Sequence, residues 1–129
     1  MHRGYLKTAV LFAALAVMLG AFVAHILKDS ASEKTMNIFE TGVRYQFYHT
    51  FALLISAILL KDFPGPLLKW ACKFFISGIL LFSFSLYILG GLQMSGHNNF
   101  QWIGAITPLG GMCFISGWLF MFIRFVKNH

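Results

Sequence analysis

The sequence predicts an all-α integral membrane protein, a four-helix transmembrane bundle that forms a single domain over residues 1–129. Hydrophobic residues make up 58% of the chain and charged residues only 11%, against about 25% charged residues in an ordinary globular domain. A water-soluble protein of this size has too little interior to hide so much apolar side chain. The apolar residues also fall into four runs, and the cations lie between the runs, as in membrane proteins.

The four predicted spans cover approximately residues 5–26, 45–60, 67–89 and 102–126. A hydrocarbon core of about 30 Å needs about 20 helical residues, so the second run is short. We expect an amphipathic helix to lengthen it, capped by Ser30 or Ser32, because Glu33 follows Ser30 at a capping-box spacing. None of the runs has the alternation of a barrel strand, and helices therefore satisfy the backbone in lipid.

The connections indicate how the spans are oriented. The turn "KDFPGPLLK" at residues 61–69 predicts a close hairpin between the second and third spans. Residues 90–101, "GGLQMSGHNNFQ", are interpreted as an uncharged polar loop. Cations favour the cytoplasmic side, so both termini and the hairpin are predicted there. That side carries Arg3, Lys7, Lys61, Lys69, Lys73, Arg124 and Lys127, and the other carries Lys28, Lys34 and Arg44.

Small residues at helical spacing predict where the spans pack closely. They recur through Ala9, Ala13, Ala16, Gly20 and Ala24 in the first span, and through Gly110, Cys113 and Gly117, with Gly111 beside them, in the fourth. Some of these faces are alternatively contacts with a second copy of the chain.

The stretch "AITPLGG" leaves two alternatives for the start of the fourth span. Thr107 and Pro108 form an N-cap and first-turn pair, so a helix can begin at Pro108 after a non-helical stretch over residues 103–106. Alternatively, one continuous helix is kinked at Pro108, because proline lacks the N–H that the helix ladder needs.

Polar residues gather in "ETGVRYQFYHTF", residues 40–51, at the mouth of the second span. Glu40 and Arg44 are four apart, in the order that favours an ion pair. Tyr45 and His49 lie on another side of the same helix, and His25 of the first span is expected at a similar depth. The candidate polar network or ligand site therefore comprises His25, Glu40, Arg44, Tyr45, Gln46, Tyr48 and His49.

Two interpretations apply to this stretch. Tyr45, Gln46 and Tyr48 suit an anchoring belt at the membrane interface. His49 lies one turn into the span, where ionisable groups find a protein partner. We favour a neutral imidazole bonded to a carbonyl over a metal ligand or proton carrier.

Other chemistry is not indicated by the sequence. A metal site needs His25, His49, His97 and Glu40 to converge, and no HxxxH or HxxE spacing is present. There is no phosphate-binding glycine-rich loop and no recognisable nucleophilic triad. We therefore expect no catalytic residues, no metal, no cofactor and no enzymatic activity, and the scattered cations argue against nucleic-acid binding.

Four segments, in order, resemble one known family. They are "LGAFVAHILK", "ETGVRYQFYHTFALL", "SLYIL" and "IGAITPLGGMCFISGW". Together they are similar to the YgdD/YwdK-like small integral membrane proteins, domain-of-unknown-function family number 423. One departure is Val23, where the family pattern has glycine. The resemblance implies four membrane helices and no established activity, and its motif positions include the polar stretch and Thr107, Pro108, Gly110 and Gly111.

The expected function is that of a non-enzymatic accessory, assembly or envelope-associated component of the plasma or inner membrane. Its partners are then the lipid bilayer and either a second copy of the chain or a larger membrane complex. Two alternatives stay open: a small oligomeric transporter or channel, and an outer-leaflet site for a lipid, quinone or metal.

Overall fold

The computed structural model describes residues 2–97 and 99–127, and all regular structure there is helical. This confirms the predicted all-α class for the described residues. A π-helical segment, η1, joins α3 and α4 into one continuous helix of 29 residues. A 3₁₀ segment, η2, leads into α5. The elements are α1 (Arg3–His25), α2 (Glu33–Leu59), α3 (Pro66–Gly78), η1 (Ile79–Ser83), α4 (Phe84–Met94), η2 (Gln101–Ala105) and α5 (Ile106–Val126).

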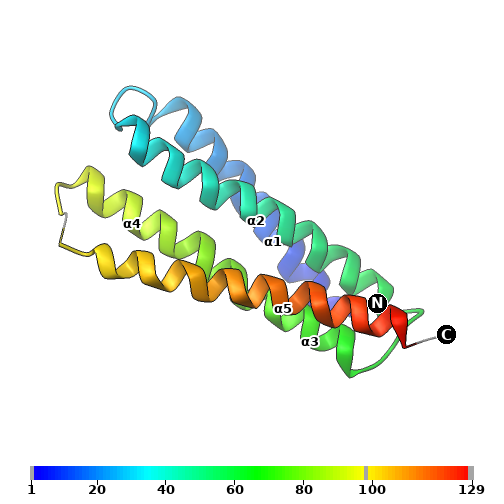
Figure 1. Ribbon diagram of the computed structural model, residues 1–129. Helices are drawn as coiled ribbons and strands as arrows, with labels where there is room; N and C mark the ends of the chain where they lie inside the picture. The colour runs from blue at the N-terminus through cyan, green and yellow to red at the C-terminus, as the bar shows by residue number, and fades with distance from the viewer. Residues whose placement is uncertain (1, 98, 128–129) are drawn as a thin grey trace.

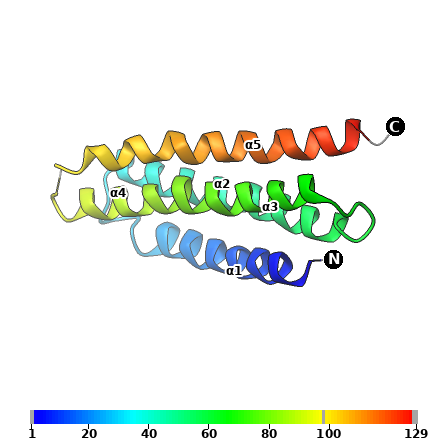
Figure 2. The same ribbon diagram turned by 90° about the horizontal axis from the view of Figure 1, so that it is seen from below.

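The helices run up and down, with α1 and α5 at opposite edges (Figure 2). Between them lie α2 and the continuous α3–η1–α4 helix. Both ends of the described chain and the α2–α3 hairpin lie at the same end of the bundle (Figure 1). Two hydrogen bonds connect these segments: the His2 N–H donates to the Ala57 carbonyl at 3.1 Å, and the Arg124 guanidinium donates to the Pro64 carbonyl at 3.2 Å.

Helix α2 begins well before the predicted span at residue 45. Ser32 is its N-cap, and the Ser32 hydroxyl oxygen accepts from the Thr35 N–H at 3.2 Å. The predicted capping box at Ser30 is therefore wrong, and the alternative predicted cap, Ser32, is the N-cap in the structure. The cap and the absence of proline carry the helix through the whole polar stretch, to Leu59.

The hairpin after α2 turns at Gly65. Its φ is +148°, a backbone conformation that side chains with a Cβ rarely adopt. Gly65 is the N-cap of α3 and Pro66 its first residue, where the missing proline N–H needs no partner.

The loop predicted over residues 90–101 is shorter in the structure. Helix α4 continues to Met94, and η2 already begins at Gln101. Tertiary contacts outweigh the local loop signal of two glycines. A Cβ on Gly90 would lie 2.8 Å from the Phe39 ring, and the Gln93 side-chain oxygen accepts from the Thr35 hydroxyl at 3.1 Å.

The start of α5 matches neither predicted alternative fully. Ala105 is the N-cap, so Thr107 and Pro108 lie inside the first turn, where proline is tolerated. The preceding residues form the 3₁₀ segment rather than a non-helical stretch. The Thr107 hydroxyl lies 2.7 Å from the Ser85 hydroxyl of α4 and so joins two helices.

Helix α5 lies directly against the backbone of η1 at Gly110. A Cβ on Gly110 would lie 2.7 Å from the Phe82 Cα and would also meet the Phe82 backbone nitrogen. A glycine is therefore required here by space. The nearby residues Phe75, Ile79 and Phe114 belong to the main apolar core, which extends from α1 to α5.

Three parts of the described chain are long and apolar enough to cross a membrane: Arg3–His25, Pro66–Met94 and Gln101–Val126. Helix α2 is not among them, because polar residues occupy its first half. The outward side chains of α5 include Met112, Ile115 and Phe122, each more than half exposed. Such a surface suits lipid rather than water.

The two neighbouring glycines of α5 provide a test of this packing. We expect Gly110→Ala to lower the free energy of unfolding by about 1–3 kcal/mol, because the added methyl overlaps the Phe82 backbone. Gly111→Ala is the matched control, since its Cβ has nothing within 4 Å. Thermal unfolding in mild detergent measures both. Equal effects of the two substitutions would contradict the close approach.

Candidate functional site

The buried polar centre of the bundle is Gln46 of α2, whose side chain is fully buried. The Gln46 amide nitrogen donates to the Phe12 carbonyl of α1 at 2.8 Å. The Gln46 side-chain oxygen accepts from the Tyr87 hydroxyl of α4 at 2.6 Å. One amide therefore joins three helices, rather than serving as part of an interfacial belt.

His49 lies one turn further along α2 and is 6% exposed. Its Nδ1 is 2.9 Å from the Tyr45 carbonyl, and its Nε2 is 3.1 Å from the Trp118 Nε1. A carbonyl only accepts and an indole N–H only donates, so Nδ1 carries the proton and the imidazole is neutral. The ring also stacks on Phe114 at a centroid distance of 3.5 Å.

Hydroxyl groups of η1 and α4 extend these links between helices. The Ser83 hydroxyl donates to the Gly42 carbonyl of α2 at 2.7 Å. A Cβ on Gly42 would lie 2.7 Å from the Tyr87 ring, so the glycine makes room for the partner of Gln46. On the other side of α4, Ser85 contacts Thr107. Buried polar groups in lipid need such partners, and these residues supply them for one another.

Four of the seven predicted site residues lie outside this network. His25, Glu40, Arg44 and Tyr48 are all exposed on the bundle surface. Within residues 2–97 and 99–127, Glu40 and Arg44 make neither the expected ion pair nor a side-chain hydrogen bond. They line a hollow of about 160 Å³ between α1 and α2. Val23, at 3% exposed, also borders it and packs with Leu27 and Phe39.

The candidate metal ligands do not converge. The described residues contain no group of three or more His, Cys, Asp or Glu that is placed to hold a metal ion. His49 is held by Tyr45 and Trp118, whereas His25 and His97 are exposed.

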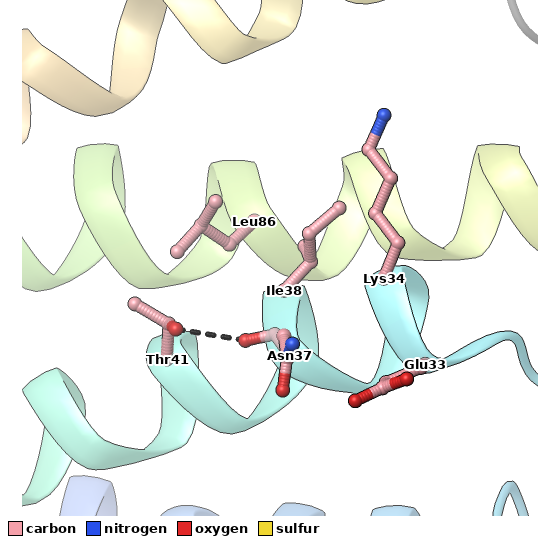
Figure 3. A pocket seen from close by; sticks show the side chains of 6 residues that line it. All are labelled: Glu33, Lys34, Asn37, Ile38, Thr41 and Leu86. Atoms are coloured by element: carbon pink, nitrogen blue, oxygen red, sulfur yellow. Dashed lines mark hydrogen bonds between the residues drawn. The ribbon is translucent and has the colours of Figure 1, made fainter.

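A larger hollow of about 520 Å³ lies between α2 and α4. Figure 3 shows Lys34 and Ile38 extending toward α4, whereas Glu33 points away from it. The Thr41 hydroxyl donates to the Asn37 carbonyl of its own helix at 2.7 Å. The polar groups that line this hollow therefore do not converge on one point. The hollow is lined by Glu33, Lys34, Asn37, Ile38, Thr41 and Leu86.

Four residues of this network were not predicted as site residues: Ser83, Ser85, Tyr87 and Trp118. Tyr87 and Trp118 do lie in the segments "SLYIL" and "SGW" that carry the family resemblance. A tyrosine and a tryptophan within apolar runs are polar donors that need partners, which is the signal that identifies them.

Comparisons with known proteins agree with these motifs. Residues 19–111 match the family model described as "Protein of unknown function (DUF423)". The chain belongs to this family. The predicted resemblance is thereby confirmed. No solved structure gives a significant match.

Similar proteins align with this chain over nearly its whole length. UPF0382 membrane protein YwdK of Bacillus subtilis is 41% identical over 116 residues, covering 89% of each chain. UPF0382 inner membrane protein YgdD of Escherichia coli is 32% identical over 122 residues, covering 92% of this chain and 88% of the relative. A UPF0382 membrane protein of Haemophilus influenzae is 37% identical over 120 residues. Family membership and three apolar helices make this chain a multi-pass membrane protein.

The Gln46 network can be tested with one hydroxyl. We expect Tyr87→Phe to lower the free energy of unfolding by about 1 kcal/mol, because the buried Gln46 oxygen loses its donor. Tyr48→Phe is the matched control, since Tyr48 is 54% exposed. Thermal unfolding in detergent compares them. If both tyrosine variants unfold like the unmodified protein, the bond contributes nothing to stability.

The tautomer of His49 is directly observable. In ¹⁵N-histidine-labelled protein at neutral pH, we expect the His49 Nδ1 to carry the proton and Nε2 to carry none, because Trp118 donates to Nε2. Trp118→Phe removes that donor, and the Nε2 resonance should move while the exposed His25 resonances stay unchanged. A proton on Nε2 of the unmodified protein would contradict this arrangement.

Proposed function

We propose that the protein is a non-enzymatic accessory or assembly component of the plasma or inner membrane, with four membrane-spanning helices and both termini in the cytoplasm. The single observation that supports this best is the buried polar network. Its polar groups bond to one another and to backbone between helices. They brace the bundle, so the surfaces are left to contact other molecules.

Helix α2 is proposed as the fourth span. Its 27 residues measure about 40 Å as a helix, enough for the hydrocarbon core and part of one headgroup region. The second half of α2 presents Phe51, Ile55 and Ile58 outward, each close to half exposed. This stripe at helical spacing is suited to lipid, and the polar first half extends toward the membrane surface.

The orientation follows from the cation count, which the arrangement of the helices supports. Both ends of the described chain lie beside the hairpin, so the cations predicted for one side are at one end of the bundle. Lys73 lies 4.8 Å from the Trp70 ring centroid, and such aromatic and basic pairs anchor helices at interfaces. The positive-inside rule then favours a cytoplasmic location for this end.

A transporter or channel has less support. The larger hollows lie between neighbouring elements or along α1, at the surface of the bundle. His49, the candidate proton carrier, has both ring nitrogens occupied. Between His49 and the hairpin the buried core is closely packed with apolar residues, including Leu53, Phe75 and Leu68. The buried Ser56 hydroxyl there donates to the Ala52 carbonyl of its own helix.

An accessory role predicts a protein partner on one edge of the bundle. Photoreactive residues placed at Met18 of α1 and at Phe122 of α5, both 66% exposed, report on opposite edges. We expect illumination of native membranes to give one protein adduct of defined mass from one edge and no protein adduct from the other.

Each position is the matched control for the other, because both are exposed apolar sites on spans. Adducts only with lipid or with a second copy of the chain would overturn the accessory role. Heterogeneous adducts at both edges would show random collision and would count equally against it.

A further inference from the structure

The hollow between α1 and α2 holds two charged side chains that the buried network does not use. It is about 160 Å³ in volume and lies open to the surroundings of the bundle. Gly20 and Ala24 line it on α1 with little or no side chain, so larger side chains at these positions would reduce its volume. The lining residues are Gly20, Val23 and Ala24 of α1 and Glu40, Val43 and Arg44 of α2.

Arg44 lacks a partner within the described part of the chain, and so does Glu40. A guanidinium offers five N–H donors and stays charged, so next to lipid it requires an acceptor. A phosphate accepts two parallel bonds from it. The carboxylate of Glu40 in turn requires a donor or a cation.

The position of the hollow along α2 places it at a membrane surface. Lys61 marks the hairpin side of the bilayer, and about 20 residues of helix cross a core of about 30 Å. Counting back from Lys61 reaches Glu40, at the edge of the hydrocarbon. Arg44 begins one turn deeper, about 6 Å along the axis, and its long side chain extends its guanidinium outward to the level of the lipid phosphates. This depth rests on α2 spanning the bilayer as proposed above.

The order of the two charges matches one class of lipid. In an aminophospholipid the phosphate lies next to the glycerol and the ammonium group lies further out. Arg44 is the deeper residue and Glu40 the outer one. We propose that this hollow binds the headgroup of a phosphatidylethanolamine from the leaflet opposite the hairpin, with the phosphate on Arg44 and the ammonium on Glu40.

The chemistry of the headgroup predicts selectivity. An ethanolamine ammonium donates hydrogen bonds to the Glu40 carboxylate, whereas the methylated choline group has no N–H to donate. A phosphatidylglycerol offers no cation at all. Gly20 packs against Val43, since a Cβ on Gly20 would lie 3.4 Å from the Val43 Cγ1, and Ala24 adds only a methyl group to the lining of the hollow.

Native mass spectrometry of the full chain, purified in mild detergent and titrated with defined lipids, tests this. We expect dioleoyl phosphatidylethanolamine to be retained about tenfold better than the choline or glycerol lipid, the difference of about one charge-assisted hydrogen bond. Arg44→Gln should abolish retention of all three lipids. Glu40→Gln should keep binding but remove the preference for ethanolamine.

Two further variants separate the site from general effects. Lys28→Gln removes an exposed cation outside the hollow and should leave retention unchanged. Ala24→Leu fills the hollow without touching either charge and should abolish retention. Because Arg44 and Ala24 are exposed, thermal unfolding of each variant should match the unmodified protein.

Equal retention of the three lipids by the unmodified protein would overturn the proposal, as would full retention by Arg44→Gln. If free phosphoethanolamine binds in preference to free phosphocholine, the proposal of a lipid site is overturned and the hollow is reassigned to a soluble ligand. These readouts use purified protein, so they are independent of the cross-linking that tests the accessory role.

Discussion

The arrangement of the bundle depends on the amide of Gln46. This side chain is enclosed by three helices and uses its donor and its acceptor on two of them, the Phe12 carbonyl of α1 and the Tyr87 hydroxyl of α4. In lipid the hydrophobic effect does not bring helices together, so polar bonds and close packing determine their register. Rotating or sliding α2 would separate both bonds at once.

The surrounding features follow from this constraint. The Tyr87 ring reaches Gln46 because Gly42 leaves space for it, and Ser83 bonds to the Gly42 carbonyl. The π-helical segment η1 ends at Ser83, one turn before Tyr87, and its residue Phe82 lies where Gly110 allows α5 to approach. A π-helical turn widens the helix and changes the direction of the side chains that follow. Neighbouring residues of η1 thus contact two different helices: Phe82 lies against Gly110 of α5, and Ser83 bonds to Gly42 of α2.

Much of the fold could be predicted because hydropathy and helix punctuation are local signals. The long apolar runs and the turn at Pro64–Pro66 indicate the up-and-down helices. Residues 90–94 and the π-helical segment were missed, because their conformation depends on Phe39, Thr35 and α5, which are distant in sequence. The candidate site divides for the same reason: periodicity places His49 and Glu40 on different faces, but cannot show that Trp118 lies beside His49.

The bond between Trp118 and His49 also has a consequence for biogenesis. Gln46 can find both its partners once the chain has been made as far as Tyr87, before the last helix exists. The His49 Nε2 gains its donor later in synthesis, because Trp118 is 69 residues further along the chain. The helices up to α4 are therefore complete before the His49 Nε2 can gain its donor. The last helix, α5, completes the interior, and a chain truncated before Trp118 would leave the buried His49 Nε2 without its donor.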